Sequence, residues 1–133
     1  MKKVITVVAA AIFKDNKLLV CRRADEGRQA LKWELPGGTV ENGESLENAL
    51  KREMVEELSL QVYVEKLIGS STLQYEYVDI QLNVFLCQIE SGTLTLNYHT
   101  DMKWASETEV YRLDLIPGDV PFIKKLPWPS ASV

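Results

Sequence analysis

The first third of the chain alternates apolar runs with polar turns, a pattern typical of paired strands. Residues 4–13 form an apolar run rich in β-branched and small side chains, and residues 17–23 form a second run. Residues 15–16 are Asp and Asn, which favour a turn, so the two runs predict a hairpin. A polar loop is expected over residues 24–32, followed by a short strand at residues 33–35 that a Pro-Gly-Gly sequence ends.

The clearest helical periodicity follows this strand. Its apolar positions recur at helical spacing with charged residues between them, and they are Leu46, Ala49, Leu50, Met54 and Leu58. Ser45 can cap the first turn through its hydroxyl, while Glu44 and Glu47 suit the positive end of the helix dipole. We therefore predict a helix from Ser45 to Leu58.

The second half of the chain predicts further strands and two short helices. The expected strands span residues 60–68, 71–78, 80–89 and 103–105, with the second and third forming a hairpin. The helices are expected at residues 106–109 and 120–126. This order predicts a mixed α/β (α+β) fold in which helices pack on a sheet. The 133 residues fit one compact domain, residues 1–133.

Composition and charge narrow the classes of ligand. The net charge of -4 argues against a nucleic-acid polymer, because such binders usually present a basic face. A small anionic substrate remains compatible, since a few Arg and Lys side chains with bound cations could hold one triphosphate. Cys21 and Cys87 each lie inside an apolar run, which predicts buried, reduced thiols and no disulfide framework.

The N-terminal sequence superficially resembles a signal peptide. Its apolar run is short, however, and leads directly into the predicted turn without a convincing cleavage site. No stretch is long enough to span a bilayer. We expect a cytoplasmic protein that binds no membrane and is a monomer or a homodimer.

Three carboxylates on the predicted helix are the main candidates for chemistry. At about 100° per residue, Glu56 and Glu57 lie within ~60° of Glu53 around the helix axis. Like charges at these spacings cost helix stability, and a divalent cation would offset their repulsion. Oxygen ligands suit Mg²⁺, with Mn²⁺ as an alternative, better than zinc. The competing interpretation is a solvated, charged helix face.

The residues around the three carboxylates favour a metal site over a solvated, charged helix face. Arg52 can tie the helix to the preceding loop through the carboxylate of Glu44, so both are assigned mainly to structure. Gly37 and Gly38 allow the backbone to approach the carboxylates closely, and a free carbonyl there could be a metal ligand.

The full spacing resembles a known motif. Its fixed positions are Gly38, Glu44, Arg52, Glu53, Glu56 and Glu57, with apolar Met54 and Leu60. With each fixed residue type at roughly 6% frequency, a chance match is on the order of 10⁻⁷ per register. The spacing over residues 38–60 resembles the Nudix box, Gly-x5-Glu-x7-Arg-Glu-apolar-x-Glu-Glu-x-Gly-apolar, with Ser59 in place of its last glycine. The strand pair, the Arg22-Arg23 pair, residues 33–38 and residues 117–121 are similar to the MutT-type branch.

The resemblance implies a fold and an activity. It implies the Nudix fold, a mixed β-sheet sandwiched between α-helices, and a Mg²⁺-dependent enzyme that cuts a nucleoside triphosphate into a monophosphate and pyrophosphate. By similarity, Glu53, Glu56 and Glu57 hold Mg²⁺ with the Gly37 carbonyl. Glu53 is expected to orient or deprotonate the attacking water, a role that could fall to a neighbour.

The resemblance also assigns the substrate contacts. Arg23 corresponds to a phosphate-contacting arginine, and Arg28 lies in a loop that closes over the nucleotide. The residues expected to line the same cleft are Glu34, Leu35, Pro36 and Gly37. Asp119 corresponds to the position that reads the base edge, where an ionised carboxylate could accept from the cytosine amino group or from a guanine N1–H and 2-amino group. A helix N-cap before Val120 is the equally plausible alternative for Asp119.

Some positions depart from the family pattern. Tyr98 stands where many members carry another acid, and Asp101 could replace that acid. His99 matches a histidine of relatives, for which a structural or loop-anchoring role competes with catalysis. Tyr75 and Tyr77 are interpreted as one face of a half-buried strand.

Three functional hypotheses follow from the resemblance. The leading one is an 8-oxo-dGTP diphosphatase that serves nucleotide-pool sanitation and so DNA repair. A pyrophosphohydrolase of CTP or another pyrimidine nucleotide is the rival within the class, and a nucleotide-sensing module that has lost catalysis is the rival from another class.

Overall fold

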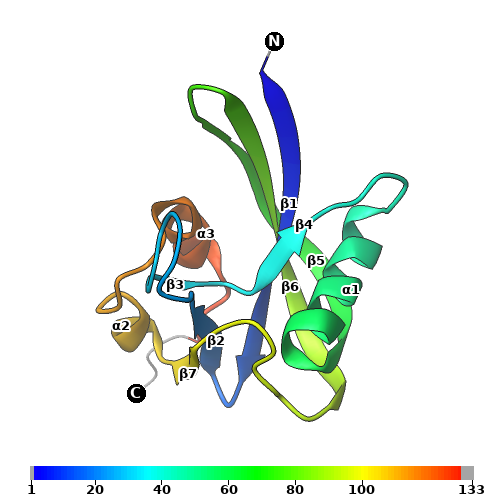
Figure 1. Cartoon of the computed structure of the whole chain (residues 1–133). Coiled ribbons are helices and arrows are strands. Elements are labelled where there is room, and N and C mark those ends of the chain that lie inside the picture. The colour runs from blue at the N-terminus through cyan, green and yellow to red at the C-terminus, as the bar shows by residue number, and fades with distance from the viewer. Residues whose placement is uncertain (1, 130–133) are drawn as a thin grey trace.

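The computed structural model describes residues 2–129, and two long parallel strands form its centre (Figure 1). Strand β1 (Lys3–Lys14) pairs in parallel with β6 (Val78–Gly92) along most of its length. Strand β5 (Leu60–Gln74) pairs antiparallel with the far side of β6, and β4 (Gly37–Thr39) pairs antiparallel with β1. The predicted domain spans residues 1–133, of which residue 1 and residues 130–133 lie outside the described residues.

The end of β1 leads into a second group of strands. The predicted hairpin is confirmed, because Phe13 and Lys14 pair with Leu18 and Lys17 of β2 (Lys17–Arg22). Strand β2 then leaves β1 and pairs on its two sides with β3 (Trp33–Glu34) and β7 (Asp101–Ala105). The whole forms a mixed seven-stranded sheet with the main order β3-β2-β1-β6-β5.

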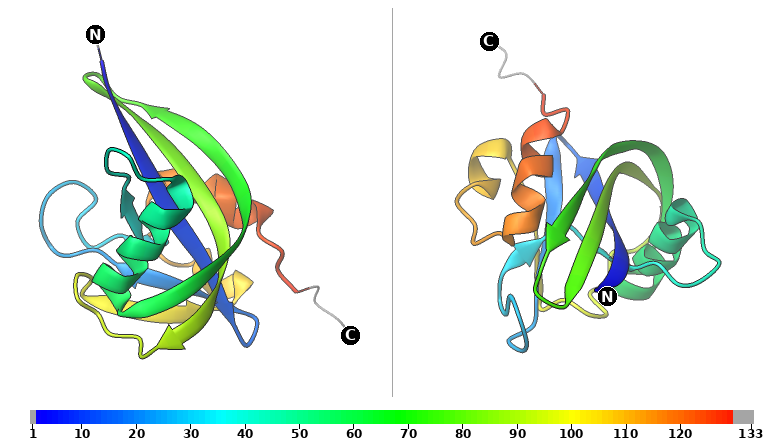
Figure 2. Two further views of the ribbon diagram at one scale, coloured as in Figure 1. Left: turned by 90° about the vertical axis from the view of Figure 1, so that its right-hand side faces the viewer. Right: turned by 90° about the horizontal axis from the view of Figure 1, so that it is seen from above.

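Helices cover both faces of this sheet (Figure 2). On one face, Val8, Ala10 and Ile12 of β1 pack in a core with the buried side of α1 (Leu46–Leu58). On the other face, Ala9 and Ala11 pack in a second core with the C-terminal helices. Those helices are α2 (Glu107–Val110), the 3₁₀ helix η1 (Pro117–Asp119) and α3 (Val120–Lys125). Period-two alternation in the buried part of β1, residues 8–12, therefore supplies both cores. The predicted sheet sandwiched between helices is confirmed.

Helix α1 begins and ends as its sequence predicts. The Ser45 hydroxyl accepts the Asn48 N–H at 3.1 Å, and the buried positions are Ala49, Leu50, Met54 and Leu58. Ser59 ends the helix in the left-handed conformation with φ of 58°, and its N–H donates to the Met54 and Val55 carbonyls. A serine thus takes the backbone geometry that glycine adopts most easily.

The later strands differ from the sequence prediction. The two strands expected at residues 60–68 and 71–78 are one strand, β5, whose register shifts between Val64 and Lys66 and between Leu67 and Gly69. These irregularities interrupt the alternation of side chains without ending the strand. Tyr75 and Tyr77 lie in the turn between β5 and β6, so their assignment to one face of a strand was wrong.

Within residues 2–129, no helix is long and apolar enough to cross a membrane.

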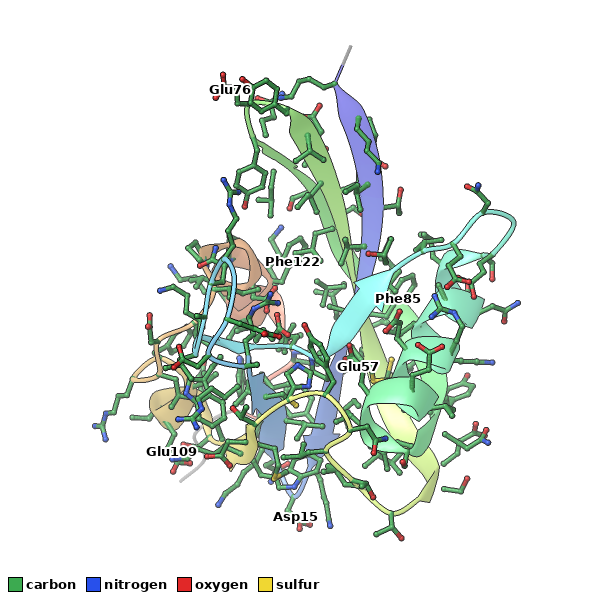
Figure 3. All side chains as sticks on the ribbon, in the orientation of Figure 1. Asp15, Glu57, Glu76, Phe85, Glu109 and Phe122 are labelled. Carbon is green, nitrogen blue, oxygen red and sulfur yellow. The ribbon has the colours of Figure 1, made fainter. Side chains whose placement is uncertain are left out.

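The turn between β5 and β6 lies at the far tip of the hairpin, where Glu76 is labelled in Figure 3.

The glycines of β4 provide a test of the close packing between β4 and its neighbours. A Cβ on Gly37 would overlap the Val8 backbone carbonyl, whereas the three atoms nearest to a Cβ on Gly38 would all belong to the carboxyl group of Glu53. Because backbone yields less readily than the end of a side chain, Gly37→Ala should lower the free energy of unfolding by about 1–3 kcal/mol. Gly38→Ala, the matched control, should lower it by less. Urea unfolding of both variants measures this, and a larger loss in Gly38→Ala would contradict the packing described.

Candidate active site

A cleft of about 420 Å³ brings together residues from distant parts of the chain. Its walls include β1 and β4, the end of β5, the start of β6, η1 and the loop after β2. Of the residues predicted to bind substrate or metal, it is lined by Arg23, Arg28, Glu34, Leu35, Gly37, Glu57 and Asp119. Pro36, which is buried, and the helix carboxylates Glu53 and Glu56 lie outside this lining.

Arg52 is the centre of the hydrogen-bond network beside the cleft. Its Nε and Nη2 donate to the two oxygens of Glu44 at 2.7 and 2.9 Å, which is a bidentate pair. Nη2 also donates to the Thr39 carbonyl at 3.0 Å, which ties α1 to the end of β4. The Arg52 hydrogen bonds, followed by the Glu41 N–H, lower the pKa of Glu44 to about 2. Glu44 and Arg52 therefore connect α1 to the loop before it and to the end of β4.

The three helix carboxylates occupy different environments. Arg52 Nη1 donates to Glu53 at 3.0 Å and to the exposed Glu56 at 3.2 Å. Glu53 packs against the bare Cα of Gly38, and burial raises its pKa although the Arg52 hydrogen bond opposes this. Glu57 points from α1 toward the middle of the molecule (Figure 3), and burial followed by the charges of Glu53 and Glu34 raises its pKa to about 8.

This acidic cluster is suited to a cation, although it is not a closed cage. Among residues 2–129, no three His, Cys, Asp or Glu side chains converge as a metal-binding group. The Oε1 atom of Glu57, however, is buried without a hydrogen-bond partner, and buried acceptors usually have one. A divalent cation would satisfy this oxygen and relieve the repulsion that raises the pKa of Glu57. An open set of hard oxygen donors fits Mg²⁺, which retains water and phosphate ligands.

The basic side of the cleft is built from Arg23 and Arg28. Arg23 Nη1 donates to Glu34 Oε1 at 3.0 Å, and Glu34 Oε2 lies 2.9 Å from His99 Nε2. The Arg28 guanidinium lies over the ring of Tyr75, with its carbon 5.3 Å from the ring centre. The loop after β2 is therefore joined across the cleft to the β5–β6 turn by a cation–π contact.

Asp119 lies buried at the base of the cleft. Its Oδ2 accepts the Leu35 N–H at 2.8 Å, which joins η1 to the short connection between β3 and β4. Asp119 occupies the N-cap position of α3, as the alternative predicted, but its side chain makes no capping hydrogen bond to that helix. Burial raises its pKa to about 7 although the Leu35 N–H opposes the shift.

Two tyrosines that the sequence did not assign to the cleft also line it. Tyr75 reaches it from the β5–β6 turn, and Tyr98 from the loop before β7. Asp101, the expected substitute for an acid at Tyr98, lies outside the lining and accepts its neighbour's N–H, that of Met102, at 2.8 Å. The pairing of β5 with β6 places Tyr75, and backbone bonds to α1 and β2 place the loop of Tyr98, so residue spacing did not show that either side chain reaches the cleft.

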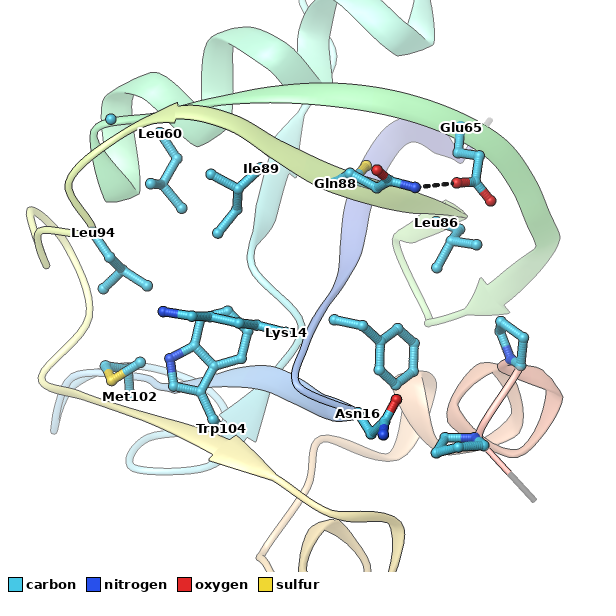
Figure 4. Close-up of a pocket in the computed structure, with 15 residues that line it drawn as sticks. Lys14, Asn16, Leu60, Glu65, Leu86, Gln88, Ile89, Leu94, Met102 and Trp104 are labelled. Atoms are coloured by element: carbon cyan, nitrogen blue, oxygen red, sulfur yellow. Dashed lines mark hydrogen bonds between the residues drawn. The ribbon is translucent and has the colours of Figure 1, made fainter. Parts of the chain in front are cut away.

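A larger cavity of about 890 Å³ lies toward the other ends of β1 and β6 (Figure 4). Trp104, Met102 and Leu94 line it together with a hydrogen-bonded pair, Gln88 and Glu65, at 2.6 Å. Its lining includes neither the helix carboxylates nor Arg23. Apart from the buried Pro36, the predicted substrate contacts therefore belong to the smaller cleft, with Glu57 on its wall and Glu53 beside its Gly38.

The buried carboxyl of Asp119 predicts a pH dependence of stability. Its folded pKa of about 7 exceeds the ordinary 3.8, so the folded state binds this proton more tightly than the unfolded state. The resulting stability is fully present below pH 3.8 and is lost as the pH rises through about 7. Because Asp119→Asn cannot titrate, wild type should lose stability relative to this variant between about pH 4 and about pH 7.

Urea unfolding with EDTA at several pH values measures this difference. The matched control is Asp114→Asn, which changes an exposed carboxylate that lies 3.0 Å from the Lys32 ammonium. Parallel stability curves for wild type and Asp119→Asn would show that Asp119 does not titrate as described.

Comparison with known proteins agrees with this geometry. Residues 2–126 match the NUDIX domain family. The CTP pyrophosphohydrolase of Escherichia coli (strain K12) is 35% identical over 92% of this chain and 90% of that protein. The 8-oxo-dGTP diphosphatase of the same strain is 30% identical over 95% of this chain and 98% of that protein.

Solved structures give the same result. The E. coli ORF135 protein matches with a TM-score of 0.82 at 34% identity, over 93% of this chain and 89% of that chain. A MutT NUDIX hydrolase from Burkholderia pseudomallei matches with a TM-score of 0.85 at 22% identity, over 94% and 99%, a likeness that shows the fold alone. The chain therefore belongs to the NUDIX domain family and is a hydrolase of phosphoric anhydrides.

Proposed function

We propose that the chain is a Mg²⁺-dependent nucleoside triphosphate pyrophosphohydrolase that releases a nucleoside monophosphate and pyrophosphate. The observation that carries this proposal is the division of one cleft into three parts. The cleft has an acidic end at Glu57, basic side chains at Arg23 and Arg28, and a buried hydrogen-bonding group at Asp119. A metal-bound polyphosphate, its free phosphate oxygens and a base would complement these three parts in turn.

The acidic end would bind the catalytic cation. Nudix hydrolases use divalent metal ions, and here Glu53, Glu56 and Glu57 would hold one together with the Gly37 carbonyl. When bound, the cation neutralises phosphate charge and makes a water molecule a better nucleophile. Glu53 is the proposed base that accepts the proton of the attacking water. The Glu53 carboxyl lies against the Gly38 backbone at the edge of the cleft, which supports this role.

The remaining residues would orient the substrate. Arg23 and Arg28 provide positive charge for the phosphate chain on the side of the cleft away from α1. Arg52 holds Glu53 through one hydrogen bond and is itself fixed by Glu44. Hydrolysis at one particular phosphorus atom depends on such positioning, because small displacements of the reacting groups lower the reaction rate.

For the base, we propose 8-oxo-dGTP as the leading substrate, in a role in nucleotide-pool sanitation. Asp119 Oδ2 already accepts the Leu35 N–H, and a guanine edge offers two adjacent donors, N1–H and the 2-amino group, to the rest of the carboxylate. CTP is the second candidate. It is favoured by the 35% identity to a CTP pyrophosphohydrolase, and its amino group is one donor for the same carboxylate.

A substrate panel separates these candidates. We expect kcat/KM for 8-oxo-dGTP to exceed the values for dGTP, CTP and 5-methyl-dCTP, and Asp119→Ala to change this ranking because it removes the base-facing acceptor. The measurement is release of pyrophosphate, with orthophosphate detected separately. No advantage of 8-oxo-dGTP over dGTP would exclude the sanitising role, and an unchanged ranking in Asp119→Ala would exclude Asp119 as the reader.

Catalysis itself is tested by Glu53→Gln, which removes charge and keeps shape. We expect kcat to fall by about 10²–10⁴-fold with unfolding by urea little changed, because a general base contributes on that order. The matched control is Glu65→Gln, an exposed carboxylate on the larger cavity, which should leave kcat unchanged.

The sensing-module alternative is tested in the same assay. The enzyme should release pyrophosphate with Mg²⁺ and stop with EDTA. A protein that binds nucleotide but releases nothing in either condition is a sensor. Near-normal turnover in Glu53→Gln would instead move the base role to a neighbour.

A further inference from the structure

We propose that His99 is the positioning residue that holds Arg23 in its substrate-binding orientation, acting through Glu34. This inference rests on the proposed function, because it requires Arg23 to contact the phosphate chain. It assigns a role to the only histidine of the chain, for which the sequence left structural and catalytic roles open.

The carboxylate of Glu34 bridges the two side chains. One oxygen, Oε1, accepts from Arg23 Nη1 at 3.0 Å, and the other, Oε2, lies 2.9 Å from His99 Nε2. A carboxylate only accepts hydrogen bonds, so Nε2 is the ring nitrogen that carries hydrogen. Because Arg23 and His99 each bind one oxygen of its carboxylate, the Glu34 side chain cannot rotate without breaking one of these two hydrogen bonds. His99 therefore fixes the direction in which Glu34 presents its other oxygen to Arg23.

Arg23 depends on this single contact. Within residues 2–129, its side chain makes no hydrogen bond other than the one to Glu34, and its Nε is buried without a partner. A long side chain held at one point loses its orientation when that point moves. A charge-assisted bond to an immobile carboxylate is the contact that can hold it.

Burial shows that His99 acts indirectly. The His99 side chain is 0% exposed, and it does not line the cleft, whereas Arg23 and Glu34 both do. Substrate in the cleft can reach Arg23 and Glu34 without meeting the imidazole. A role as general acid or base toward the substrate is therefore excluded by position, and support of Glu34 remains.

The loop that carries His99 has its own backbone anchor. The Thr100 N–H donates to the Arg22 carbonyl at 3.0 Å, beside the residue that His99 is proposed to control. Asn97 N–H donates to the Glu57 carbonyl at 2.9 Å on the other side of His99. Substitution of the imidazole leaves these bonds in place, so the loop should keep its course and the variants should fold.

The experiment compares His99→Phe with His99→Gln. Phenylalanine fills the space but cannot donate, whereas the glutamine side-chain amide can donate to Glu34. We expect His99→Phe to raise the KM for the triphosphate substrate roughly 10-fold, the loss typical of one hydrogen bond to a charged group, with kcat changed less. His99→Gln should restore most of the wild-type KM. The buried variant Cys87→Ala, which is remote from the cleft, is the control for general destabilisation.

A double-mutant cycle with Arg23→Ala tests the route through Arg23. The probe is inorganic tripolyphosphate, bound in the presence of Mg²⁺ and measured by calorimetry. His99→Phe should weaken binding in wild type and add no further loss in the Arg23→Ala background, since an indirect role disappears with its target. Equal losses in both backgrounds, equal KM values for the two His99 variants, or a fall in kcat at unchanged KM would overturn the inference.

The same data keep the inference separate from the proposed function. Absence of pyrophosphate release from wild type with every triphosphate overturns the proposed function. Tripolyphosphate binding still reports on His99 in that case, because the calorimetric cycle requires no turnover. Wild-type turnover with a His99→Phe variant that binds and reacts normally overturns only the role of His99.

Discussion

Repulsion among Glu53, Glu56 and Glu57 is the constraint on which the candidate active site depends. Three carboxylates on one side of a helix destabilise it unless positive charge or hydrogen bonds oppose them. Arg52 supplies that charge from the same helix, and its bidentate bond to Glu44 stops it from turning to solvent. The bond from Arg52 to the Thr39 carbonyl extends this restraint to the strand that carries Gly37 and Gly38. One guanidinium thus restrains Glu53, Glu56 and the end of β4, whose glycines also pair with β1, while Oε1 of Glu57 stays without a partner.

The parts of the fold that sequence reasoning found are those set by local interactions. The limits of α1, its serine cap and the β1–β2 hairpin depend on residues within a few positions of one another. The parallel pairing of β1 with β6 joins residues 75 positions apart, and no local pattern encodes it. The short strand β4 was missed for the same reason, because glycines pair there only through the backbone of β1. The irregular alternation that suggested two strands reflects bulges in β5, which long pairing with β6 keeps continuous.

The candidate site likewise combines residues that local sequence reveals with contacts between distant parts of the chain. Spacing on a helix identified the carboxylates, because three residues one turn apart must share a face. Resemblance named Arg23, Glu34 and Asp119 but could not say what holds them. The contacts that do so, from Glu34 to His99 and from Leu35 to Asp119, join residues 65 and 84 positions apart. The side chain of Asp119 turns toward Leu35 and away from α3 because that buried N–H offers a partner at the base of the cleft. Tyr75 and Tyr98 reach the cleft from turns whose positions only the assembled sheet determines.

The two carboxyls with the most strongly raised pKa lie in the same cleft but differ in what would satisfy them. Glu57, with a pKa of about 8, is buried, has one oxygen without a donor and lies near the charges of Glu53, Glu34 and Glu56, so added positive charge would lower the cost of its ionisation. Asp119, with a pKa of about 7, already receives an N–H, and a further neutral donor would favour its charged form. A ligand that brings a cation to one end and a hydrogen-bond donor to the other meets both requirements. A metal-bound nucleotide has this distribution of charge, whereas an inorganic polyphosphate lacks the donor and a nucleoside lacks the cation. The different requirements of Glu57 and Asp119 therefore argue for a whole nucleotide with its metal ion as ligand.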